Sequence, residues 1–253
     1  MRFGTFLVGA VLVGMMALSA DAIVVRHNGV QIAQMDFEGL TQGNASAADS
    51  SFVDSVGTAF ALQVAGTGAG GIPANEGSQF GHCTGCKTGW VFTPTSIDTG
   101  ELEVEWHVYK STGSEVMGFS LANDTDISGG TKRAQLEIGF TGLGQTEDSV
   151  NIRDPGVNDT GLDVNLDDWN QMRLVYTFNT SDPADDAWTL FVNGAEQPHA
   201  LTNLNIGTGS GIDRFGIEGT GSGVNAGVDI VPEPASAALL LIGAGLLGGR
   251  RRR

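Results

Sequence analysis

Basic residues, cysteines and aromatic residues are scarce in this chain of 253 residues. Thirteen lysines and arginines stand against 29 aspartates and glutamates, two residues are cysteine, and 7% are aromatic. Nucleic-acid binding needs Lys and Arg to neutralise phosphates, so this balance excludes nucleic acid as an expected partner. The sequence also lacks a glycine-rich phosphate loop with Lys and Ser/Thr, a Gly-x-Ser-x-Gly element and a His pair at metal-ligand spacing.

The amino-terminal end has the order of residues expected of a secretory signal peptide. Met1-Arg2 is followed by an apolar run from Phe3 to Leu18 and by Ser19-Ala20-Asp21-Ala22, whose Ala-x-Ala spacing suits signal peptidase. The run is short for a permanent span, so we expect signal peptidase to remove residues 1–22. A retained amino-terminal membrane helix is the alternative.

The carboxy-terminal end has the order of a stop-transfer segment. Val231 and the motif Pro232, Glu233, Pro234 precede an apolar stretch from Ala235 to Gly249, and the chain ends with Arg250, Arg251, Arg252 and Arg253. About fifteen apolar residues would enter the bilayer as a transmembrane helix while the arginines stay on the cytoplasmic side. The preceding domain is therefore expected outside the inner membrane.

This tail, residues 231–253, resembles the PEP-CTERM sorting signal, which is also described as the carboxy-terminal domain of ice-binding proteins. The resemblance implies that an exosortase recognises the motif and delivers the protein to the cell surface or the extracellular matrix. The protein would be anchored in the inner membrane only transiently. An ordinary anchor that is never cut is the alternative.

The part between the two ends, residues 23–230, is strongly acidic. It keeps 8 of the 13 basic and 27 of the 29 acidic residues, a net charge of −19. Solubility outside the cell accounts for such a balance, and calcium held by some of the carboxylates is the alternative.

The same part is predicted to form one all-β domain. Its many glycines suit turns between short strands. Residues Glu101–Tyr109 alternate strictly, with Leu102, Val104, Trp106 and Val108 on one face. Asn193-Gly194 predicts a type I′ hairpin turn. Further strands are expected at Phe60–Val64, Gly89–Phe92, Val116–Leu121, Ala134–Phe140, Gln171–Phe178, Ala187–Val192 and Asp213–Ile217.

Three segments resemble concanavalin A-like, laminin G-like jelly-roll domains. They are Trp169–Tyr176, Trp188–Gly194 with its Val-Asn-Gly turn, and Ile212–Ile217; Met35–Glu38 is similar to the opening strand of those domains. The resemblance implies a two-sheet sandwich that binds carbohydrate and, in some members, calcium. It also implies a final strand beside the start of the domain, for which Gly227–Ile230 leaves only four residues.

Glu101, Glu103 and Glu105 project from one face of a predicted strand. Successive carboxylates are about 6.5–7 Å apart by strand rise, close to the spacing that glycoside hydrolysis uses. The strand resembles the catalytic strand of laminarinase and lichenase-type glucanases, which implies Glu101 as nucleophile and Glu105 as acid/base, with Glu103 where those enzymes have Asp. Sugar or cation binding by this face and a solvated strand face are the alternatives.

Cys83 and Cys86 are the only cysteines and lie three positions apart, beside His82. In an oxidising compartment this spacing predicts a small-loop disulfide, which Gly85 helps to close. A thioredoxin-like redox site, a c-type haem attachment and a zinc site with His82 remain open as alternatives.

Acidic loop clusters are expected at Asn123–Asp126, Asp159–Asp168 and Asp182–Asp186. Solvated turns are the simplest interpretation, and calcium would be held by Asp124, Asp126 and Asp163. The sequence as a whole predicts an exported, noncatalytic β-sandwich that binds polysaccharide. A glycoside hydrolase and a purely structural matrix protein are the alternatives.

Overall fold

The structure is a computed structural model that describes residues 23–35, 37, 40–57, 61–64, 72, 79–83, 85–113, 116–123, 132–142, 144–153, 156–182, 185–200, 211–220 and 226–229. The predicted signal peptide 1–22 and the predicted membrane helix within 231–253 lie outside these residues. Among the described residues, no helix has the length and apolar character needed to cross a membrane.

The described chain consists of β-strands and one short helix. The strands are β1 (Ile23–His27), β2 (Val30–Met35), β3 (Gly43–Asn44), β4 (Phe52–Gly57), β5 (Ala61–Val64), β6 (Gln79–His82), β7 (Cys86–Val91), β8 (Glu101–Lys110), β9 (Val116–Ala122), β10 (Lys132–Ile138), β11 (Ser149–Arg153), β12 (Val157–Asp163), β13 (Asp168–Thr177), β14 (Ala187–Val192), β15 (Ala195–Ala200), β16 (Arg214–Thr220) and β17 (Ala226–Asp229). The helix α1 is Ala45–Ala48, capped by the side chain of Asn44.

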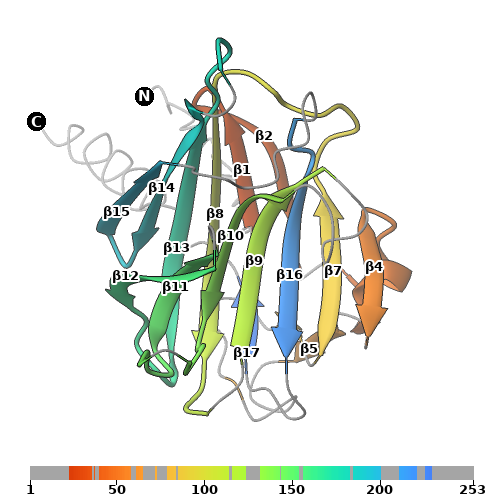
Figure 1. Ribbon diagram of the computed structural model, residues 1–253. Helices are drawn as coiled ribbons and strands as arrows, with labels where there is room; N and C mark the ends of the chain where they lie inside the picture. The colour runs from red at the N-terminus through yellow and green to blue at the C-terminus, as the bar shows by residue number, and fades with distance from the viewer. Residues whose placement is uncertain are drawn as a thin grey trace, which may run out of the picture.

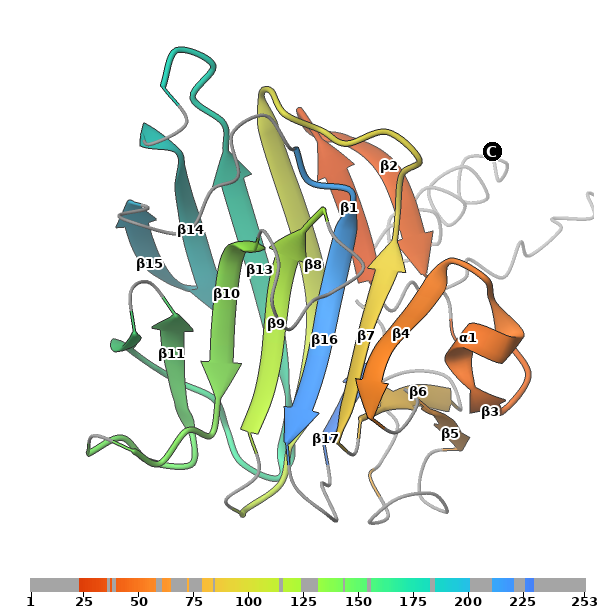
Figure 2. The same ribbon diagram turned by 45° about the vertical axis from the view of Figure 1, so that its right-hand side comes forward.

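The strands form two antiparallel sheets that pack face to face (Figures 1 and 2). The ten-stranded sheet has the order β15-β14-β13-β8-β17-β6-β5-β3, with β1 beside β8 and β2 beside β1. The seven-stranded sheet has the order β12-β11-β10-β9-β16-β7-β4. The predicted all-β sandwich is confirmed.

The core lies between the sheets and follows the predicted alternation. Leu102, Val104, Trp106 and Val108 of β8 are fully buried, as the period of two requires. Trp106 packs against Phe119 of β9 and Phe215 of β16, with ring centroids 5.2 and 4.9 Å away. These aromatic contacts join the two sheets at their centre.

Most of the predicted strands are present with shifted ends. The predicted Ala134–Phe140, for example, is Lys132–Ile138, and Asp213–Ile217 is Arg214–Thr220. The Asn193-Gly194 turn is confirmed: both residues have positive φ, 50° and 83°, and they connect β14 to β15. The acidic loop expected at Asp159–Asp168 is wrong over its first half, because residues up to Asp163 belong to β12. Pairing with β11 and the buried Thr160 hold this polar edge strand in place.

Candidate functional site

Glu101, Glu103 and Glu105 lie on the outer face of the ten-stranded sheet, as the alternation of β8 requires. Glu101 is exposed, Glu103 is partly buried and Glu105 is 9% exposed. The neighbouring strand β1 places Arg26 directly opposite Glu103. On the other side, β13 places Arg173 opposite Glu105.

Two of these carboxylates are held by ion pairs and hydrogen bonds on both of their oxygens. Arg26 donates to Glu103 and, over 3.0 Å, to Glu105. Arg173 donates to the second oxygen of Glu103 over 3.1 Å, and Gln171 donates to the second oxygen of Glu105 over 2.6 Å. This arrangement fixes the positions of Glu103 and Glu105 through both oxygens of each carboxylate.

The charge of Arg26 is part of the same network. Burial alone would lower the pKa of Arg26, but hydrogen bonds to Glu105 and Glu103 outweigh burial and raise it. Two of the three predicted acidic residues, Glu103 and Glu105, are therefore neutralised in part by arginines of the flanking strands. The structure brings Glu103 and Glu105 together around one arginine and leaves Glu101 outside this network.

A hollow of about 230 Å³ lies beside this network, on the same outer face. Gln171, Arg173, Phe191 and Gly194 line it. The guanidinium of Arg173 stacks on the ring of Phe191, with its central carbon 3.7 Å from the ring centroid. The aromatic side chain is thus already covered by a cation from its own sheet.

The outer face of the seven-stranded sheet carries a second set of polar residues, which the sequence reasoning missed. Ser120 of β9, Glu137 of β10, Asn151 of β11 and Arg214 of β16 each alternate with core residues and therefore project away from the core. Each of them is nevertheless at most 9% exposed. Half-buried Gln135 and Glu218 lie on the same face.

These four side chains each contain a buried polar atom with no hydrogen-bond partner. The atoms are Ser120 Oγ, Glu137 Oε2, Asn151 Oδ1 and Arg214 Nη1. A polar group shielded from water without a partner costs about 1–3 kcal/mol. Native proteins keep few such groups, so four on adjacent strands of one face call for a physical reason.

The register places these residues in three neighbouring rows across the sheet. Ser120 is opposite Gly216 and Gln135, and Gly216 is opposite Gly89. In the next row Gly118 lies between Glu218 and Glu137, and Glu137 is opposite Asn151. On the other side of the Ser120 row, Arg214 is opposite Ala122. Gly118 lies against its neighbours in this row, because a Cβ there would be 3.4 Å from the Cβ of Glu218 and 3.9 Å from the Cγ of Glu137.

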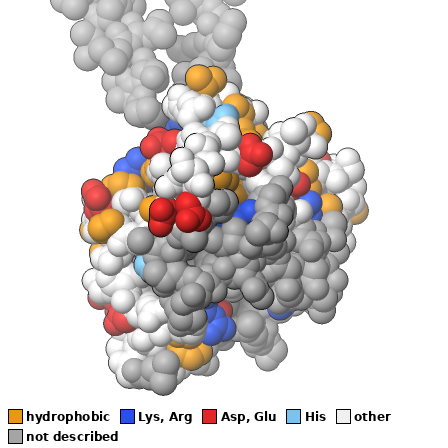
Figure 3. All heavy atoms as spheres, turned by 45° about the horizontal axis from the view of Figure 1, so that its top comes forward, with side chains coloured by type: hydrophobic (Ala, Val, Ile, Leu, Met, Phe, Trp, Pro, Cys, Tyr) orange, Lys and Arg blue, Asp and Glu red, His pale blue; other side chains and the backbone are white. Residues whose placement is uncertain are grey.

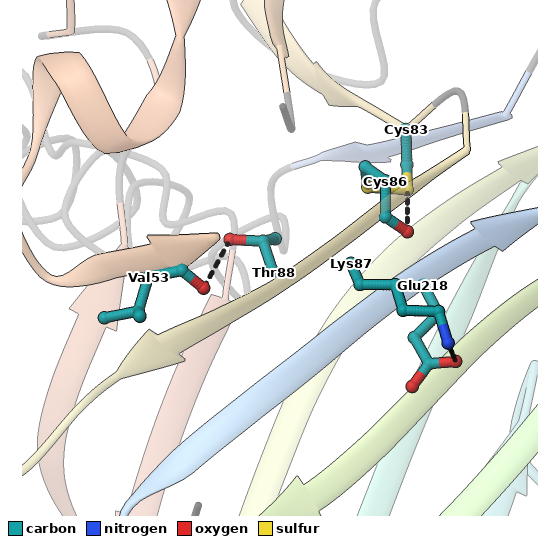
Figure 4. Close-up of a disulfide and its surroundings, with 6 residues drawn as sticks. All are labelled: Val53, Cys83, Cys86, Lys87, Thr88 and Glu218. Carbon is teal, nitrogen blue, oxygen red and sulfur yellow. Dashed lines mark hydrogen bonds and ion pairs between the residues drawn. A yellow bond between two sulfur atoms is a disulfide. The ribbon is translucent and has the colours of Figure 1, made fainter. Parts of the chain in front are cut away.

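Charged residues around these rows are paired with each other. Lys132 and Lys87 contact Glu218 at 2.7 and 3.7 Å, the second pair being shown in Figure 4. Arg153 contacts Oε1 of Glu137 at 3.0 Å, whereas Oε2 is the oxygen without a partner. We use the name outer polar face for the surface formed by seven residues of the seven-stranded sheet. They are the polar residues Ser120, Glu137, Asn151 and Arg214 and the glycines Gly89, Gly118 and Gly216.

The predicted disulfide between Cys83 and Cys86 is present (Figure 4). Both cysteines are fully buried, and Gly85 between them has a φ of 62°, which a side chain would disfavour. Gly219 of β16 lies against this bridge: a Cβ there would be 2.8 Å from Cys83 Sγ. The bridge joins the end of β6 to β7 and thereby links the two sheets.

The calcium candidates are not brought together in the described residues. Asp124 and Asp126 lie outside the described residues, and Asp163 is exposed at the end of β12. Burial of its carboxyl and the charges of Asp148 and Asp159 raise the pKa of Asp163. Within the part of the chain described, no three His, Cys, Asp or Glu residues form a metal-sized group. Acidic side chains occupy separate places on the end of the sandwich in Figure 3.

A polar cluster inside the core was also missed. The hydroxyl of Tyr176 donates to Asp186 over 2.8 Å, and the other oxygen of Asp186 accepts from the backbone of Asn179 over 2.6 Å. Burial first, and then Asp186, raise the pKa of Tyr176, whereas Arg133 lowers it. Arg133 lies at a register irregularity of β10, where the alternation that guides sequence reasoning is interrupted.

Residues 231–253 match the family model of the PEP-CTERM protein-sorting motif. The chain carries a PEP-CTERM sorting motif. The motif indicates export and a cell-surface destination through an exosortase, as the order of Pro-Glu-Pro, apolar stretch and arginines predicted. The match covers the carboxy-terminal 23 residues and does not extend to the sandwich.

No curated protein matches this chain. Among solved structures, the T. cruzi calreticulin globular domain has a TM-score of 0.46 at 11% identity, covering 83% of this chain and 93% of that one. The carbohydrate recognition domain of Emp46p in its potassium-bound form has 0.40 at 12%, covering 77% and 91%. A protein of unknown function with a galectin-like fold from Bacillus subtilis has 0.39 at 8%, covering 76% and 96%.

Proposed function

We propose that this PEP-CTERM protein is a noncatalytic carbohydrate-binding protein of the cell surface, and that polysaccharide binds on the outer polar face of the seven-stranded sheet. The observation that carries the proposal is the set of four buried, unpartnered polar atoms on β16, β9, β10 and β11. Three of them are oxygens and one is a guanidinium nitrogen. Sugar hydroxyls both donate and accept, so one class of ligand satisfies all four.

The geometry of the face supports this ligand class. Four adjacent strands span about 14 Å at 4.7–4.9 Å per spacing, and the three rows span about 13–14 Å along the strands. The charges on this face balance each other in ion pairs, which favours a neutral or weakly charged polyol over a strongly anionic ligand.

The proposal also includes the route by which the protein reaches the cell surface. Signal peptidase removes residues 1–22, and an exosortase processes the tail that begins at Val231, so that the sandwich reaches the surface or the extracellular matrix. Within this proposal the sandwich is a concanavalin A-like jelly roll of the laminin G-like type. The ion pairs that occupy Glu103 and Glu105 support a noncatalytic role for β8.

A glycan array with the purified full-length chain tests the proposal, with Ser120→Ala as the decisive variant. This substitution removes one unpartnered oxygen and no existing hydrogen bond, so the fold is expected to remain intact. Loss of one hydrogen bond to a sugar lowers affinity about 5- to 10-fold. Gln171→Ala is the control on the opposite sheet, where Gln171 lines the hollow; because it also removes the hydrogen bond to Glu105, its melting temperature is measured beside that of Ser120→Ala.

Binding that is weakened by Ser120→Ala and unchanged by Gln171→Ala supports the outer polar face. If only Gln171→Ala loses binding, the saccharide binds on the ten-stranded sheet, and the proposal is contradicted. Absence of binding to every saccharide, with normal export, favours the purely structural matrix role instead.

A further inference from the structure

Strand β2 lies at one edge of the ten-stranded sheet. Among the strands of the described residues it pairs with β1 alone, and β1 separates it from β8 (Figure 2). The outer edge of such a strand carries backbone N–H and C=O groups that can pair with a strand of another chain. The six residues of β2 therefore offer about 20 Å of backbone for a contact of this kind.

The same strand carries exposed apolar side chains. Within the described part of the chain, the large apolar side chains that are exposed are Val30, at 66%, and Ile32, at 42%. Ile32 is the extra residue of a bulge and has no opposite residue on β1. Bulges redirect side chains, and this one turns an apolar side chain toward solvent. Apolar surface beside a strand edge is the surface that a strand-to-strand contact buries.

β2 also lacks most of the features by which edge strands exclude a partner. Its sequence, Val-Gln-Ile-Ala-Gln-Met, contains no charged residue and no proline. Two other outermost strands contain them: β12 has Asp159 and Asp163, and β15 has Glu196 and Pro198. Charged residues and proline at an edge prevent pairing with another chain. The bulge is the remaining protective feature of β2, and it interrupts a contact at one position.

The distribution of charge indicates a second copy of this chain as the partner. Two copies with a net charge of −16 each repel one another where their acidic surfaces meet. The hairpin of β1 and β2, residues 23–35, contains no aspartate or glutamate, although the chain has 29. Two copies can approach each other there without opposing carboxylates. A strand that pairs antiparallel with its own copy is self-complementary and gives a closed two-fold dimer.

We propose that β2 is the interface of a homodimer. The β2 strands of two copies pair antiparallel about a two-fold axis at Ile32, the exposed apolar residue near the middle of the strand, and join the two ten-stranded sheets into one. A single short strand buries less than the roughly 1,200 Å² of a standard interface, so the dimer dissociates reversibly. The inference is independent of carbohydrate binding, because the outer polar face lies on the other sheet.

Sedimentation equilibrium of the full-length chain in detergent tests the dimer, with Ile32→Lys as the decisive variant. Two lysines would face each other at the axis, and like charges opposite each other destabilise strand pairing. We expect dimerisation to weaken about tenfold or more. Thr177→Lys is the matched control: Thr177 is an exposed residue of β13 in the same sheet, and β8 and β1 separate it from β2.

Unchanged melting temperatures show that both variants remain folded. A dimer that Ile32→Lys weakens and Thr177→Lys leaves intact supports the proposal. Both variants keep the two ends of the chain, so a dimer formed through the ends persists in Ile32→Lys, and that result overturns the proposal. A wild type that is monomeric up to about 100 μM also overturns it.

The dependence on salt tests whether the contact is uncharged. Because both copies are acidic, raising the ionic strength from about 0.02 to about 0.3 M shortens the range of their repulsion and is expected to strengthen the dimer. A dimer that salt weakens would be held by ion pairs, which contradicts an interface made by β2.

Ile32→Cys tests the position of the axis directly. The two natural cysteines are joined in a disulfide, so the new thiol is the one available for cross-linking. Residues directly opposite each other on antiparallel strands have Cβ atoms about 4.5–5.5 Å apart, close enough for an added oxidant to form a disulfide between copies. A covalent dimer with Ile32→Cys and none with Thr177→Cys supports the proposal, and equal yields from the two variants overturn it.

Discussion

Arg173 stacks on Phe191 across two neighbouring strands of the ten-stranded sheet, and the same guanidinium donates to Glu103. The plane of the guanidinium allows both contacts at once, because the stacked face and the N–H edge point in different directions. The pair thereby holds one end of the network that fixes Glu103 and Glu105.

Arg173→Lys is expected to lower the free energy of unfolding by about 0.5–1 kcal/mol, or roughly 1–4 °C in melting temperature. Lysine keeps the charge but loses the planar stacking, and the partial exposure of the pair limits the effect. Thermal melting measures the change. In the Phe191→Leu background the same substitution should have a smaller effect, and equal effects in both backgrounds would contradict the importance of stacking.

A second prediction concerns Gly219, which lies against the disulfide. Gly219→Ala would place a Cβ 2.8 Å from Cys83 Sγ and 2.9 Å from the Cys83 carbonyl oxygen. We expect a loss of about 1–3 kcal/mol in unfolding free energy, since the backbone cannot yield as a flexible side chain can. Gly118→Ala is the control in the neighbouring strand, because its Cβ would make ordinary contacts at 3.4 Å or more. Similar destabilisation by both variants would refute the specific clash.

The buried Tyr176 predicts that the stability of the fold depends on pH in the alkaline range. Burial and Asp186 raise the pKa of Tyr176 in the folded protein above the value of about 10 in the unfolded chain. The contribution of Tyr176 to stability is therefore complete below about pH 10 and is lost as the pH rises further. Tyr176→Phe should remove this part of the alkaline decline in melting temperature.

At neutral pH the same variant leaves Asp186 Oδ2 without its buried donor, which costs about 1–3 kcal/mol. Melting curves between pH 7 and 11 for both proteins measure the two effects together. An alkaline decline that is identical in wild type and Tyr176→Phe would show that other groups cause it.

A fourth prediction addresses the glycoside hydrolase alternative. The ion pairs of Glu103 and the two hydrogen-bonded oxygens of Glu105 predict that the purified protein releases no reducing ends from β-glucans. Incubation with laminarin and lichenan, followed by a reducing-end assay, measures this. Release that disappears in Glu101→Gln would establish the enzyme and contradict the noncatalytic function.

The sequence alone predicted the features that depend on residues close together in the chain. The alternation in β8 identified its buried face, and Asn193-Gly194 identified the hairpin between β14 and β15 because both residues need positive φ. The spacing of Cys83 and Cys86 was sufficient for the disulfide.

Features that depend on the pairing of strands far apart in the sequence could not be predicted in the same way. Arg26 reaches Glu103 from 77 positions away, so the ion pairs of β8 are invisible in the local pattern. Ser120, Glu137 and Asn151 are ordinary polar residues of three different strands, and only the strand order brings them together. Alternation with core residues was a usable signal for their outward direction, but nothing local indicated which strands are neighbours.

The edge of β8 that β1 and β17 share determines when the sandwich can be completed. Its two partners come from opposite ends of the described chain, so the contact order of this sheet is high and folding is expected to be slow. During translocation β8 enters the new compartment long before residues 226–229 do. The central strand therefore cannot be fully paired until residues 226–229, near the end of the chain, are available.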